Sequence, residues 1–305
     1  MSISPFYTIH RYREDVYKVV AFKGNRDPDV VYLRDREEYS HYDNKLDSNF
    51  SRARSMVLQY ALCNPWDWFF TGTLDPDRWG RDDLSKFMLD FSQKIRDWRK
   101  EYESQIQVLL IPEHHKDGSW HVHGMMRGIP SWHLYRFWWL PLRFLELETS
   151  PGNILKSLFP WKLCERSEWR YWDDFNDRYG YCSLAPIKDP VATAFYISKY
   201  VSKELSQRSG DLGKHLYFHS RSLKKAEKAS DIYMYNSRLD GFCTQEYDFC
   251  KIGMVKNAPS YFPYVWDGAD FDCGAYESCE PLEHPSEFHP ADIDPYYEQM
   301  KIPGY

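Results

Sequence analysis

Residues 111–124 constrain the fold of this chain more than any other segment, because they predict a β-hairpin whose strands pair in one register. Apolar and β-branched residues lead into the segment, and residues 120–124 leave it with two histidines two positions apart. Successive strand side chains point to opposite faces, so His121 and His123 share a face. Residues 116–118, Lys-Asp-Gly, fit a three-residue loop that ends on a glycine in the left-handed conformation.

The length of this loop decides which side chains converge. With a three-residue loop, Glu113 lies directly opposite His121, and His123 follows on the same face. A two-residue Asp-Gly loop would shift the register by one and move Glu113 to the other face. Two imidazoles and a carboxylate on one face can hold a divalent metal ion acting as a Lewis acid, and His115 is the second choice for the third ligand. The alternative is that the histidines are ordinary polar strand residues.

Two further segments carry motifs in a fixed order with this hairpin. Residues 68–75 alternate aromatic residues with threonines, and residues 196–203 contain two overlapping copies of Tyr-x-x-Lys. Together with Trp-His-Val-His-Gly at residues 120–124, they resemble the three motifs of the HUH endonucleases, the initiators of rolling-circle replication. The resemblance covers residues 60–230 and is nearest to the initiators of plasmids and phages of Gram-positive bacteria.

The resemblance implies an enzyme, a metal-dependent DNA endonuclease that nicks and joins single-stranded DNA at one site. A tyrosine would attack the scissile phosphate and leave a 5′-phosphotyrosine and a 3′-hydroxyl that primes synthesis. Mg²⁺ or Mn²⁺ is the implied cofactor, since both accept oxygen and imidazole ligands. Origin DNA is the implied partner. The chain has no Gly-x-x-x-x-Gly-Lys-Ser/Thr loop, so a host helicase and host replication proteins are expected as partners.

The tyrosines of the third motif fall on a helix predicted to start at Asp189-Pro190. Tyr196 and Tyr200 are four residues apart and share a helix face, and Lys199 and Lys203 follow them by three residues each. A tyrosine with a pKa near 10 is a poor nucleophile at neutral pH, so it needs a metal at the phosphate and a cation near the developing phenolate. The alternative is that these side chains only pack at the rim of an amphipathic helix.

Two other functions stay open on the sequence. The same chemistry would serve an HUH transposase or a mobilisation relaxase. A DNA-binding repressor with a structural metal and no nuclease activity is the alternative from another class, and the two Tyr-x-x-Lys copies count against it.

Charge is distributed unevenly along the chain. The formal net charge is −6, but residues 231–305 contain 14 acidic against 4 basic side chains, and residues 1–230 contain 31 acidic against 35 basic. A mildly basic catalytic part with an acidic tail fits DNA contact better than the average does. The candidates for phosphate contact are Arg52, Arg54, Lys224 and Lys225, with solvated side chains as the alternative.

A strand, a helix and then the hairpin predict an α+β fold, a ferredoxin-like or RRM-like antiparallel sheet with flanking helices. We expect an N-terminal extension with a basic helix (1–60), the nicking and joining domain (61–230) and an acidic, Tyr- and Pro-rich tail (231–305) that is partly disordered. We also expect a helix near residues 131–139.

The seven cysteines form no Cys-x-x-Cys pair, and their odd number suits a reducing compartment, the cytoplasm of a bacterial host cell. The N-terminus lacks the features of a signal peptide, and no run of about 20 apolar residues occurs, so no membrane association is expected. The oligomeric state is left open.

Overall fold

Two compact units make up the chain, as its internal contacts divide it. The computed structural model describes residues 6–23, 41–75, 78–79, 84–114, 120–136, 168–201, 216–233, 237–246, 250–258, 262 and 279–282. We call residues 48–223 the hairpin unit, to which residues 287–305 are also assigned, and residues 1–47 with 224–286 the terminal unit.

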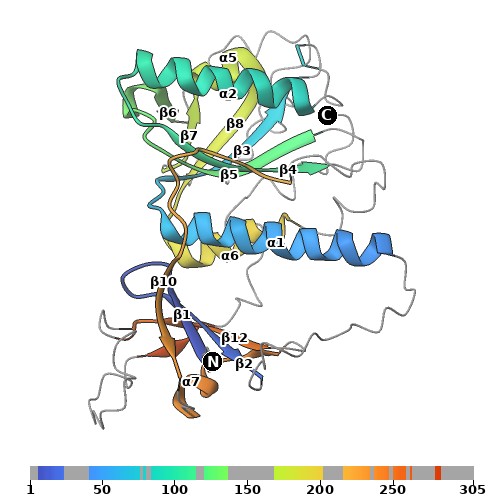
Figure 1. The fold of residues 1–305 in the computed structure, drawn as a ribbon. Coiled ribbons are helices and arrows are strands. Elements are labelled where there is room, and N and C mark those ends of the chain that lie inside the picture. The colour runs from blue at the N-terminus through green and yellow to red at the C-terminus, as the bar shows by residue number, and fades with distance from the viewer. Residues whose placement is uncertain are drawn as a thin grey trace, which may run out of the picture. The chain divides into compact units, whose positions relative to one another are not determined.

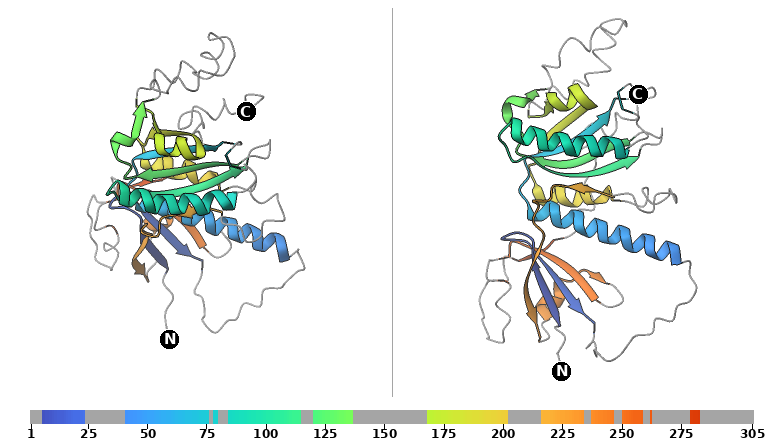
Figure 2. Two further views of the ribbon diagram at one scale, coloured as in Figure 1. Left: turned by 90° about the horizontal axis from the view of Figure 1, so that it is seen from above. Right: turned by 45° about the horizontal axis from the view of Figure 1, so that its top comes forward.

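The hairpin unit is built on a seven-stranded sheet in the order β6-β7-β8-β3-β5-β4-β9, in which every neighbouring pair is antiparallel. Helices α2 and α5 cover one face, and α1 and α6 cover the other (Figures 1 and 2). The strands are β3 (Trp68–Leu74), β4 (Gln107–His114), β5 (Trp120–Arg127), β6 (Leu134–Arg136), β7 (Arg170–Trp172), β8 (Gly180–Pro186) and β9 (Phe218–His219). The helices are α1 (His41–Cys63), α2 (Leu84–Glu101), the single 3₁₀ turn η1 (Ser131–His133), α5 (Asp173–Tyr179) and α6 (Pro190–Lys199).

Apolar side chains from α2, α5 and one face of the sheet form the core of this unit. The residues that α2 buries recur every three or four positions, which is the amphipathic pattern expected from the sequence. They are Leu84, Phe87, Met88, Phe91, Ile95 and Trp98. Aromatic rings of α2 and α5 meet edge-on, with Phe91 and Phe175 at a centroid distance of 5.9 Å. This packing fixes which sheet face points away from α2.

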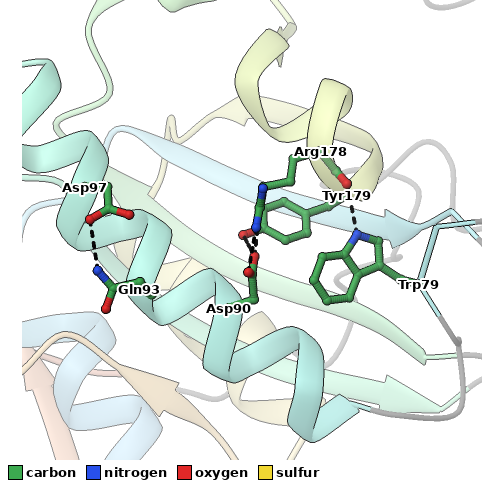
Figure 3. Close-up of polar contacts among 6 residues, drawn as sticks. All are labelled: Trp79, Asp90, Gln93, Asp97, Arg178 and Tyr179. Atoms are coloured by element: carbon green, nitrogen blue, oxygen red, sulfur yellow. Dashed lines mark hydrogen bonds and ion pairs between the residues drawn. The ribbon is translucent and has the colours of Figure 1, made fainter.

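Polar contacts join α2 to the end of α5 beside that core (Figure 3). Arg178 donates to both carboxylate oxygens of Asp90, at 2.8 and 2.6 Å, and the Tyr179 hydroxyl donates to the same carboxylate at 2.5 Å. Trp79 Nε1 donates to the backbone oxygen of Arg178 at 2.9 Å. The hydrogen bonds from Arg178 hold the pKa of Asp90 below its usual value, and burial raises the pKa of Tyr179.

We expect Asp90→Asn to lower the free energy of unfolding at pH 7 by about 1 kcal/mol, because the pair that it breaks is partly exposed. The pKa of Asp90 is lower in the folded chain, so its contribution is complete above the unfolded carboxyl pKa and is lost as the pH falls through the folded value. Urea unfolding at pH 7 and at pH 3 measures this difference. Asp97→Asn is the control, since Asp97 accepts from Gln93 on the same helix, and equal losses in both variants would contradict the assignment.

The terminal unit contains a second antiparallel sheet, which joins the two ends of the chain. Its order is β10-β1-β2-β12-β11, with β13 beside β12. The elements are β1 (Tyr7–Arg11), β2 (Tyr17–Phe22), β10 (Glu227–Ile232), α7 (Ser237–Gly241), β11 (Gln245–Glu246), β12 (Cys250–Lys256) and β13 (Glu280–Pro281). One face packs into an apolar core that includes Ile9, Tyr17, Val19 and Val255.

The predicted fold class is confirmed, because both units are antiparallel sheets with helices beside them. The helix expected near residues 131–139 is wrong where the structure describes it. Only η1 is helical there, and β6 follows it as an edge strand paired with β7. In the described ranges, no helix has the length and the apolar character needed to cross a membrane.

The boundaries from contacts differ from the three segments expected from the sequence. Strand β2, expected in an N-terminal extension, pairs with β12, which lies in the expected acidic tail. The net charge of residues 231–305 concealed this strand, in which Gly253 and Val255 are buried. Most of the part expected to be disordered, residues 283–305, lies outside the described residues.

Candidate functional site

The sheet face that points away from α2 carries two histidines and two threonines at its centre. Alternation along β5 places Val122 in the core with α2 and turns His121 and His123 to the other face. On the neighbouring strand β3, Thr71 pairs with His123 and Thr73 pairs with His121. Directly opposite residues of an antiparallel pair share a face, so these four side chains form two adjacent rungs.

The predicted register of the hairpin is confirmed. Glu113 on β4 is the direct partner of His121 on β5, and the pairing continues without a bulge from Gln107 to His114. The carboxylate therefore lies on the face of the two histidines, as the three-residue loop requires. His115 and the loop residues 116–118 lie outside the described residues.

The side chains of this face are in direct contact. His123 Nε2 lies 2.7 Å from Glu113 Oε2, and its Nδ1 lies 3.3 Å from Thr71 Oγ1. His121 Nδ1 lies 3.0 Å from Thr73 Oγ1. The sequence did not predict a role for the threonines, although their two-residue spacing on a strand matches that of the histidines.

The donor set of this face fits a divalent ion. Two ligand atoms bound at right angles to one ion, each about 2.1 Å from it, lie about 3 Å apart, which is close to the separation of Glu113 Oε2 and His123 Nε2. His121 offers a further imidazole on the same face. As the side chains stand, however, no three His, Cys, Asp or Glu residues in the described part of the chain are grouped closely enough to hold a metal.

Helix α6 presents both tyrosines of the third motif to this face. It starts where the sequence predicts, because the Asp189 side chain accepts hydrogen bonds from the backbone N–H groups of Val191 and Ala192, both at 2.9 Å. The hydroxyl groups of Tyr196 and Tyr200 lie 2.5 Å apart. Tyr196 is 3% exposed, whereas Tyr200, at the C-cap of α6, is only half-buried.

The ring of Tyr200 stacks on the imidazole of His123, with a centroid distance of 4.2 Å and an interplanar angle of 15°. Phe69 packs beside both groups, 5.5 Å from the Tyr196 ring and 6.3 Å from the His123 ring. The fold thus brings together the second and third motifs, which are 73 to 79 residues apart if counted between His121 or His123 and the two tyrosines. All these residues belong to the hairpin unit.

The structure does not bring the other predicted residues to this cluster. Lys199 is half-buried in the last turn of α6, and Lys203 lies outside the described residues. The candidates for DNA contact are exposed: Arg52 and Arg54 on α1, and Lys224 and Lys225 at the start of the terminal unit's second segment.

The glycine that follows the second histidine is required by packing. A Cβ atom added at Gly124 would lie 2.3 Å from Leu110 Cδ2 and 2.6 Å from the backbone oxygen of Leu109. A side chain there would push β4 away from β5 next to His123. The short distance to a backbone atom cannot be relieved by a change of rotamer.

We expect Gly124→Ala to destabilise the hairpin unit by about 1–3 kcal/mol, the usual cost of forcing an extra carbon into a packed interior. Thermal unfolding measures the loss. Gly241→Ala is the matched control, because a Cβ atom there has no heavy atom within 4 Å. Unchanged stability of Gly124→Ala would show that the strands can separate without cost.

Comparison with known proteins adds one finding. Residues 67–205 match a family model of replication-associated proteins, the one described by ORF2. The matched segment runs from the residue before β3 to beyond α6, and so includes every element that carries the site. No curated protein and no solved structure matches the chain. The match supports a replication initiator, and hence a protein that interacts with DNA.

Proposed function

We propose that the chain initiates rolling-circle replication as a metal-dependent nicking and joining enzyme of the HUH type. The observation that carries this proposal is the stacking of Tyr200 on His123. It places a potential nucleophile against a potential metal ligand, on a sheet face where a carboxylate and a second imidazole are also present. A repressor with a structural metal has no need for a tyrosine at that position.

Glu113, His121 and His123 would hold the ion, either Mg²⁺ or Mn²⁺. A bound divalent ion supplies Lewis-acid polarisation of a phosphodiester. The threonines keep the Nδ1 atoms of both histidines engaged toward β3, which turns each Nε2 atom away from that strand. Orientation of ligands by such partners is usual in metal sites.

Tyr200 would attack the scissile phosphorus through its hydroxyl oxygen. The new Oη–P bond replaces the bond from phosphorus to the 3′ oxygen, and that oxygen leaves with a proton as the 3′-hydroxyl. Tyr196 lies within hydrogen-bond distance of Tyr200, and donation from its hydroxyl would stabilise the developing phenolate. Lys199, and by the family's pattern Lys203, would supply positive charge.

We expect His121→Ala and His123→Ala to abolish cleavage of a single-stranded origin oligonucleotide, and Glu113→Ala to reduce it severely. Each change removes one of three ligands and leaves the ion loosely held. Cleavage in the presence of Mn²⁺ measures the effect. His115→Ala is the control and should cost less. An inactive His115→Ala beside an active Glu113→Ala would show that the third ligand is misassigned.

We expect Tyr196→Phe and Tyr200→Phe each to retain formation of a covalent protein–DNA adduct, with the larger loss in Tyr200→Phe because Tyr200 is the more exposed. The double variant should form no adduct. Denaturing electrophoresis of the protein with a labelled oligonucleotide measures the yield. A single variant as inert as the double variant would show that one tyrosine acts alone, and an undiminished adduct in the double variant would reject the proposed nucleophiles.

A further inference from the structure

The two threonines of β3 occupy equivalent positions on neighbouring rungs of the sheet. Thr71 is the cross-strand partner of His123, and Thr73 is the partner of His121. In both pairs the hydroxyl oxygen meets Nδ1 of the imidazole, at 3.3 and 3.0 Å. The repetition shows that strand register, and not one chance rotamer, sets the orientation of both rings.

This orientation has a consequence for the other ring nitrogen. Nδ1 and Nε2 lie on different edges of the imidazole, so a ring that turns Nδ1 toward β3 turns Nε2 toward β4. The contact of His123 agrees, because its Nε2 lies 2.7 Å from Glu113 Oε2 on β4. The threonines thus decide which nitrogen each histidine presents on the side of the carboxylate.

Burial makes the hydroxyl contact costly to lose. Thr71 is 3% exposed and His123 is 1% exposed. A buried polar atom that loses a hydrogen bond pays for the desolvation of that atom, since water cannot replace the partner. The contact between Thr71 and His123 Nδ1 therefore contributes to holding the ring in this orientation.

A hydroxyl group suits this position because it can both donate and accept. When the neutral His123 ring donates from Nε2 to the Glu113 carboxylate, Nδ1 accepts from Thr71. When Nε2 offers its lone pair to a cation, its proton leaves to water or to Glu113, Nδ1 takes up a proton, and Thr71 accepts from it. The ring holds one proton in both states, and rotation of one hydroxyl satisfies each.

We propose that Thr71 and Thr73 are positioning residues of the metal site, which fix the Nε2 atoms of His123 and His121 for a divalent cation. The inference rests on the proposed function, because it concerns ligands of the proposed site. Loss of a partner that orients a metal-bound histidine typically lowers metal affinity by about 10–100-fold. The threonines touch neither the ion nor the substrate in this scheme.

The test is Mn²⁺ binding by the full-length protein, measured from the electron paramagnetic resonance signal of free Mn²⁺. We expect Thr71→Val, which keeps the shape and removes the hydroxyl, to weaken binding by about 10–100-fold. Thr71→Ser should restore it. Ser183→Ala is the matched control, because Ser183 is a buried hydroxyl residue that pairs with Thr71 on the side away from His123.

The outcomes separate the inference from the proposed function. Wild-type protein that binds no Mn²⁺ would overturn the proposed metal site itself. Wild-type binding with an undiminished affinity in a folded Thr71→Val, or an equal loss in Ser183→Ala, would overturn the positioning role alone. If Thr71→Val does not fold, Thr73→Val decides, because Thr73 is less buried and holds His121 in the same way.

Discussion

The antiparallel register of β3, β5 and β4 is the constraint on which the candidate site depends. Side chains alternate strictly along a strand, so a shift of one residue in β5 would exchange Val122 with His121 and bury imidazoles in the core beneath α2. The apolar face gains most of the packing energy, and it thereby determines which side chains appear on the polar face. The polar face needs no packing specificity of its own to be assembled correctly.

The sequence predicted the part of the site that local geometry controls. The opposition of Glu113 and His121 followed from the length of one loop, because a hairpin connects its strands directly. The contact that the carboxylate makes is nevertheless with His123, diagonally across the pair. A glutamate side chain is long enough to reach a diagonal neighbour, and loop length alone does not distinguish the two partners.

The remaining contacts depend on pairings that sequence spacing cannot reveal. A strand, a helix and a second strand suggest that β3 and β4 are parallel neighbours, whereas β5 lies between them and pairs antiparallel with β3. The role of Thr71 became visible only with that order. In the terminal unit, β1 pairs with β10 across more than two hundred residues, for example Thr8 with Asp231, and the acidic composition of the second segment gave no sign of it.

The position of Tyr200 at the end of α6 has a consequence for its reactivity. The C-terminal end of a helix carries partial negative charge, which disfavours a phenolate there. Helix α6 therefore opposes the ionised form of this tyrosine, and any stabilisation has to come from the Tyr196 hydroxyl, from Lys199 in the last turn, or from charge held on the histidine face. Because Tyr200 stacks on His123, a cation bound at His123 would lie close enough to provide that charge. In this arrangement the tyrosine is a weak nucleophile until the sheet face binds its ion, so that metal binding and activation of the nucleophile are coupled through one pair of stacked rings.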